Sequence, residues 1–144
     1  MATEVYEDYG VRFEYPSDWT VEATEEEDVT TVDLQHPEGV AFILVRSDES
    51  CSDPEETADL ALEAMREEYP DLDASPVIET LGENIVTGHD VEFFSLDVAN
   101  AATIRCFRTP RRTVLVFGQW SDLIGEDAAD LVRGVFRSLE ELED

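Results

Sequence analysis

The chain has 144 residues, in which 36 Asp and Glu face nine basic residues, all of them Arg, for a formal net charge of −27. A field this negative repels polyanions, which argues against binding to nucleic acid through its phosphates or to an anionic membrane surface. Hydrophobic residues make up 42% of the chain, enough for the buried core of one domain of this length.

The first predicted element is a strand over residues 11–15, where apolar and charged side chains alternate with a period of two. Pro16 ends this strand, and Trp19 brings a large aromatic ring back towards the core. A short strand over 20–23 and an acidic loop over 24–28 are expected next. The opening segment therefore predicts a strand and a following turn that aromatic side chains anchor to the core.

Two more strands and a helix complete the predicted N-terminal half. The alternation over 29–35 predicts a half-exposed strand, 36–39 a turn, and the apolar run 40–45 a central strand covered on both faces. The helix is expected over 54–69, with Asp53 as its N-cap and its apolar stripe formed by Ala58, Ala61, Leu62, Met65 and Tyr69.

The second half of the chain predicts an antiparallel meander and then a second helix. The meander strands are 77–81, 85–98, 103–108 and 113–120, with a bulge or tight turn at 87–89 and connecting turns at 99–101 and 109–111. The helix is expected over 126–142, because apolar residues from Ala128 to Leu142 keep the i, i+3, i+4, i+7 spacing. Helices separated by a run of strands indicate the α+β class: one domain over 1–144, with a twisted antiparallel β-sheet covered by two helices.

Three places in the chain carry a resemblance to a known family. The sequence Gly10-Val-Arg-Phe-Glu-Tyr-Pro-Ser-Asp-Trp19, the helix over 54–69 and the closing sequence Val135-Phe-Arg-Ser-Leu139 resemble the corresponding parts of the PsbP/Mog-like fold family. The resemblance implies an α/β/α sandwich, in which helices lie on both faces of the sheet. It also implies binding to another protein, as an adaptor or accessory subunit, in place of catalysis.

Residues that could carry chemistry are few and widely spaced. His36, His89, Cys51 and Cys106 are the soft metal ligands, and none stands at Cys-x-x-Cys or His-x-x-x-His spacing. The cysteines are expected to be reduced, with Cys106 buried in a strand, and His89-Asp90 is expected in a turn. The pattern predicts no catalytic residue, no metal site and no cofactor.

The basic residues are concentrated at one predicted hairpin. Arg105, Arg108, Arg111 and Arg112 fall within eight residues of an otherwise acidic chain. Two interpretations stand side by side: the four pair with nearby carboxylates, or they contact a small anion or a partner, since guanidinium groups bind carboxylates bidentately.

The functional expectation is a non-enzymatic protein-binding or adaptor module in the cytoplasm, as a monomer or weak dimer. No signal-peptide pattern and no apolar run of membrane-spanning length are present. The acidity indicates a surface adapted to a salty interior, where ions screen the repulsion, or alternatively a surface for a basic partner. A small-ligand or metal-binding protein, or an enzyme of an unrecognised type, is the alternative.

Overall fold

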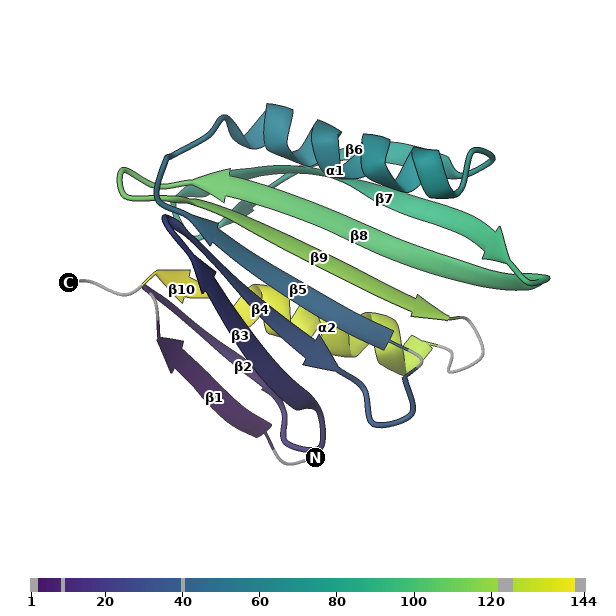
Figure 1. Ribbon diagram of the computed structural model, residues 1–144, viewed down its shortest axis with the longest axis horizontal. Helices are drawn as coiled ribbons and strands as arrows, with labels where there is room; N and C mark the ends of the chain where they lie inside the picture. The colour runs from purple at the N-terminus through teal and green to yellow at the C-terminus, as the bar shows by residue number, and fades with distance from the viewer. Residues whose placement is uncertain (1–2, 9, 40, 122–125, 142–144) are drawn as a thin grey trace.

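The computed structural model describes residues 3–8, 10–39, 41–121 and 126–141, which form two helices and two antiparallel sheets (Figure 1). The larger sheet has seven strands in the order β3-β4-β5-β9-β8-β7-β6, and the smaller one has the order β1-β2-β10. The elements are β1 Thr3–Asp8, β2 Val11–Pro16, β3 Thr20–Glu26, β4 Val29–Gln35, β5 Ala41–Asp48, α1 Pro54–Glu68, β6 Asp73–Leu81, β7 Asn84–Ser95, β8 Val98–Arg108, β9 Thr113–Ser121, α2 Glu126–Ser138 and β10 Glu140–Glu141.

The helices cover opposite faces of the seven-stranded sheet. On β9, Val114 and Val116 belong to the core cluster that includes residues of α2, whereas Leu115 between them belongs to the cluster beneath α1. Because successive strand residues point to opposite faces, the two clusters lie on opposite sides of the sheet. The expected α+β class, the antiparallel meander and the sandwich of helices around the sheet are therefore confirmed.

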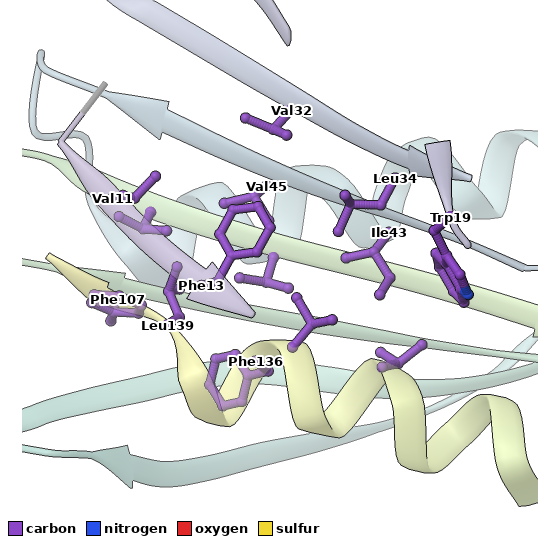
Figure 2. Packing of buried hydrophobic residues seen from close by; sticks show 14 of the residues in the cluster. Val11, Phe13, Trp19, Val32, Leu34, Ile43, Val45, Phe107, Phe136 and Leu139 are labelled. Carbon is purple, nitrogen blue, oxygen red and sulfur yellow. The ribbon is translucent and has the colours of Figure 1, made fainter. Parts of the chain in front are cut away.

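The opening strand is built into the larger of the two cores. Phe13 is fully buried and stacks on Tyr6 of β1, with ring centroids 5.0 Å apart. Trp19 is 5% exposed, and its backbone N–H donates to the Pro16 carbonyl at 3.1 Å, which closes the turn after β2. Figure 2 shows Phe13 and Trp19 in the same apolar layer as Phe136 of α2. The prediction that this segment anchors the core is confirmed.

Helix α1 begins as its sequence predicts. The side chain of Asp53 accepts a hydrogen bond from the backbone N–H of Glu55 at 3.1 Å, and Pro54 occupies the first turn, where its missing N–H has no cost. Ala58, Leu62 and Met65 are buried against β7, β8 and β9. The helix is thus positioned by its apolar stripe.

Two turns lie elsewhere than predicted. Strand β3 continues to Glu26, so the expected acidic loop over 24–28 shrinks to Glu27 and Asp28. The β7–β8 hairpin turns at Leu96 and Asp97, both with positive φ (53° and 64°), and not at 99–101. A two-residue loop of this kind needs type I′ geometry, which Asn and Gly adopt most readily. Because Leu96 is an unusual residue in such a turn, the sequence did not indicate it.

The predicted interruption at 87–89 is also wrong, because β7 pairs regularly with both neighbours through Gly88. Glycine is required there, since a Cβ would lie 1.7 Å from the backbone oxygen of Ile104. Strands β1 and β10 were not anticipated: α2 ends at Ser138, and Glu140 and Glu141 pair with β2. The predicted helical position of Leu142 lies outside the described residues.

Candidate functional site

The four clustered arginines do not form one site. Arg105 is half-buried on the α2 face of β8, whereas Arg112 is 4% exposed in the β8–β9 connection. Arg108 and Arg111 are exposed, and Arg108 donates to the carbonyl of Cys51 at 3.4 Å. The sequence grouped these residues by spacing, and the alternation of the strand separates them in space.

Arg105 joins three neighbouring strands. Its Nε donates to Oε1 of Glu79 on β6 at 2.7 Å, and its Nη2 donates to Oδ1 of Asp90 on β7 at 2.9 Å. Its Nη1 donates to the carbonyls of His89 and Ile104 at 3.3 and 3.0 Å. Its Nε, Nη1 and Nη2 all donate hydrogen bonds within the protein. Arg105 therefore matches the first interpretation, in which the arginines pair with nearby carboxylates.

Arg112 also interacts with a carboxylate of the same chain. Its Nε lies 3.2 Å from Oε2 of Glu141, and Glu141 also accepts from the hydroxyl of Thr109. The guanidinium lies against Gly10, where an added Cβ would overlap it and where φ is +84°. Arg112 therefore ties the β8–β9 connection to β10 and to the β1–β2 turn, and it is not available to a partner.

The histidines and cysteines are each held by their surroundings. His89 lies within β7, not in a turn as predicted, and its Nε2 is 2.9 Å from Oδ1 of Asp59 on α1. Cys106 is fully buried, and this burial raises the pKa of its thiol to about 12, as expected for a structural cysteine. Cys51 and Cys106 are both free thiols. Over the described ranges, no group of three or more His, Cys, Asp or Glu residues is placed to hold a metal ion.

The outer margin of the large sheet exposes apolar side chains that the sequence did not single out. Ile78 on β6 is 79% exposed and Ile85 on β7 is 72% exposed; we call these two residues the edge patch. They are diagonal neighbours on one face, because Ile78 pairs with Thr87 and Thr80 pairs with Ile85. The only signal in the sequence was that apolar residues occupy both faces of these strands.

A second apolar feature stands at the opposite end of the same strands. Phe94 at the end of β7 is 76% exposed, and Leu96 in the following turn is 95% exposed. Together with the edge patch, they are four of the six large hydrophobic residues that are exposed within the described parts of the chain. Exposed apolar side chains are therefore concentrated on β6, β7 and the turn that follows.

A cavity of about 350 Å³ opens between α2 and strands β6 to β9. One wall is apolar, with Val116 and Trp120 of β9 facing Val132 and Phe136 of α2. Three arginines also line it, namely Arg105, Arg133 and Arg137. No sequence pattern predicts this cavity, since its walls come from segments far apart along the chain.

Comparison with known proteins gives similarity of fold alone. No family model matches the chain, and no curated protein sequence matches it. Among solved structures, cyanobacterial PsbP (CyanoP) from Synechocystis sp. PCC 6803 aligns with a TM-score of 0.64 at 13% identity, covering 97% of this chain and 92% of that one. LpqN of Mycobacterium tuberculosis, described as involved in cell envelope biogenesis, aligns with a TM-score of 0.62 at 12% identity, covering 99% and 91%.

A protein from Bacteroides thetaiotaomicron aligns with a TM-score of 0.60 at 12% identity over 93% of this chain. The chain spans 46% of that protein's length. These similarities show that the chain has the PsbP/Mog-like fold, as the resemblance implied. Among the described helices, none is long and apolar enough to cross a membrane.

Proposed function

We propose that this chain is a non-enzymatic protein-binding module, an adaptor whose partner docks on the edge patch at the outer margin of the large sheet. The observation that carries the proposal is the pair of adjacent, exposed isoleucines, Ile78 and Ile85, on the two outermost strands. Exposed large aliphatic side chains that gather at one place on the surface are a feature of sites that bind other proteins.

The position of the patch also favours protein binding. Strand β6 ends the order of the seven-stranded sheet, so its outer edge has no hydrogen-bonded neighbour among the described strands. Leu81 and Asn84 form the pair that closes the β6–β7 hairpin, and hydrogen-bonded and non-hydrogen-bonded pairs alternate from there along the two strands. Ile78 and Thr80 belong to the non-hydrogen-bonded pairs, so their backbone N–H and C=O groups point away from β7, towards the open edge. An extended segment of a partner can therefore pair with this edge while its side chains cover the patch.

Charge defines the chemistry of this partner. The chain carries −27, and acidic residues flank the patch, with Glu83 in the adjoining turn and Asp59 on α1 held by His89. A second copy of the chain would bring another strongly negative surface to the contact. The proposed partner is therefore a different protein, which presents an extended, basic and partly apolar segment to the edge patch.

The potential catalytic groups support a non-enzymatic role. His89 is held by Asp59, and Cys106 is a buried thiol whose pKa is raised to about 12. His36 accepts a hydrogen bond from the backbone of Glu38 and packs edge-on against Trp19. The two histidines therefore have structural partners, and the Cys106 thiol is enclosed by the core.

Site-specific photocrosslinking tests the proposal. A photoreactive amino acid replaces Ile78 in one variant and, as the matched control, Leu60, which is 66% exposed on α1. We expect a discrete heterologous adduct in native cells from the first variant alone. The captured protein is then identified, purified and titrated against the unmodified chain.

In that titration, Ile78→Ser and Ile85→Ser should each weaken binding by about 10- to 100-fold, because each removes a buried aliphatic side chain from the contact. Leu60→Ser should leave the affinity unchanged. Equal crosslinking from both positions, an adduct between two copies of the chain, or unchanged affinity in the serine variants would each refute the proposal.

A further inference from the structure

The cavity between α2 and the sheet is distinct from the edge patch in both face and chemistry. The cavity lies on the α2 face of the large sheet, whereas the edge patch lies on the α1 face. Ile85 is an even number of residues away from Val91 along β7, so both side chains point to the α1 face, and Ile78 shares that face as a diagonal neighbour of Ile85. Its volume of about 350 Å³ falls within the range of small-molecule sites.

The cavity concentrates the scarce cations of the chain. Its lining takes in 16 of the 144 residues but three of the nine arginines. Arg105 is fixed by Glu79 and Asp90 and serves as part of the wall. Arg105 offsets one of these two negative charges, so that the two carboxylates repel an anion in the cavity less than they would without it.

The other two arginines of the lining, Arg133 and Arg137, are exposed on α2. Arg133 and Arg137 stand four residues apart on α2, which places them on the same side of the helix. Arg133 is 58% exposed and has one ion pair, to Asp130 at 3.5 Å, while Arg137 makes no ion pair with any residue that the structure describes. Two like charges at this spacing repel each other, and an anion bound between them would relieve the repulsion.

We propose that the cavity binds a small organic acid with one carboxylate and a flat apolar body. The apolar body lies against Trp120 and Phe136, and the carboxylate lies between the guanidinium groups of Arg133 and Arg137, which form charge-assisted, bidentate hydrogen bonds with it. Glu92, also in the lining, disfavours ligands of higher negative charge. The site therefore selects a monocarboxylate over a phosphorylated compound.

Binding of naphthoate, monitored by tryptophan fluorescence, tests this site. The background is Trp19→Phe, which leaves Trp120 as the sole tryptophan reporter. Measurements are made near 1 M salt, where a Debye length of about 3 Å screens the overall negative field. We expect saturable quenching by naphthoate and weaker quenching by the uncharged naphthalene carboxamide.

The double variant Arg133→Gln with Arg137→Gln should weaken naphthoate binding by roughly tenfold or more, the loss expected for charge-assisted hydrogen bonds. The matched control is Arg66→Gln with Arg108→Gln. Arg66, like Arg133, is an exposed helical arginine paired with an acid three residues earlier. This control should bind like the parent, and the melting temperatures should confirm that both double variants fold.

Several results would overturn the inference: no binding of naphthoate, equal binding of the carboxamide, stronger binding of naphthylmethylamine, or equal weakening in the control. Partner binding through the edge patch is unaffected by any of these results, because it depends on different residues. The ligand site and the docking surface can therefore fail separately.

Discussion

The neighbouring residues Arg111 and Arg112 provide a direct test of how the acidic chain uses its cations. Arg112 is 4% exposed and its Nε lies 3.2 Å from Glu141, whereas Arg111 is exposed. Arg112→Met keeps most of the side-chain length but removes the charge. Breaking a buried ion pair from one side costs about 3–5 kcal/mol, and the 21% exposure of the Glu141 side chain places this case near 3.

This free energy converts directly into a melting shift. For 144 residues, the unfolding entropy is about 0.3 kcal/mol per kelvin, so a loss of about 3 kcal/mol lowers the melting temperature by roughly 10 °C. Arg111→Met should change stability by no more than about 0.5 kcal/mol. Adding Glu141→Met to Arg112→Met should restore much of the loss, since no unpaired charge is then left buried.

Thermal unfolding followed by circular dichroism, with urea titration as the second measurement, distinguishes the outcomes. Near 1 M salt, exposed charges are screened over about 3 Å, so that changes in surface repulsion contribute little. If Arg112→Met and Arg111→Met melt within about 2 °C of each other, the buried pair is not a structural clamp and the reasoning fails.

Three further predictions concern Trp19 and the two cysteines. Trp19→Ala should cost about 3–5 kcal/mol in urea unfolding, because the ring is 5% exposed; near-parental stability would mean that the ring does not support the turn after β2. For the cysteines, a maleimide should label Cys51 and spare Cys106 in the folded chain at pH 8, as mass spectrometry of the two sites would show, since burial raises the pKa of Cys106 to about 12. The thiol of Cys106 ionises near pH 9 in the unfolded chain and near pH 12 in the folded chain, so ionisation favours the unfolded state between these values. The free energy of unfolding should therefore fall more steeply with pH over this range than it does in Cys106→Ala. Equal slopes, or early labelling of Cys106, would refute its burial.

The sequence predicted those elements whose signals are local. The cap at Asp53 and the apolar stripe of α1 depend on spacing within one helix, and the alternation over 11–15 depends on one strand. Strand β1 escaped prediction because its side chains are mostly exposed, so no burial pattern marks it. The turn at Leu96 and Asp97 was missed because Leu96 is not a usual choice for positive φ, and the pairing of β7 with β8 overrides that preference.

The candidate sites were less accessible to sequence reasoning. The cluster of four arginines was visible, but spacing along a chain does not reveal that Arg112 is buried whereas Arg111 is exposed. The cavity requires α2 to pack over the sheet, which brings Arg133 within the same lining as Arg105. The edge patch could be recognised only once the strand order was known. Ile78 is exposed because β6 is the last strand of the sheet.

The placement of cations explains how so acidic a chain keeps a precise fold. Arg105 joins β6, β7 and β8, Arg112 joins the β8–β9 connection to β10, and Arg12 of β2 lies 3.9 Å from Glu140 of β10. These contacts join segments that are distant in sequence, where repulsion between carboxylates would otherwise separate them. Because partly buried pairs are screened less than exposed charges, Arg105 and Arg112 remain effective at high salt while the surface repulsion declines. The same distribution leaves Arg133 and Arg137 exposed on α2 and in the lining of the cavity, where we propose that they hold the carboxylate of a ligand.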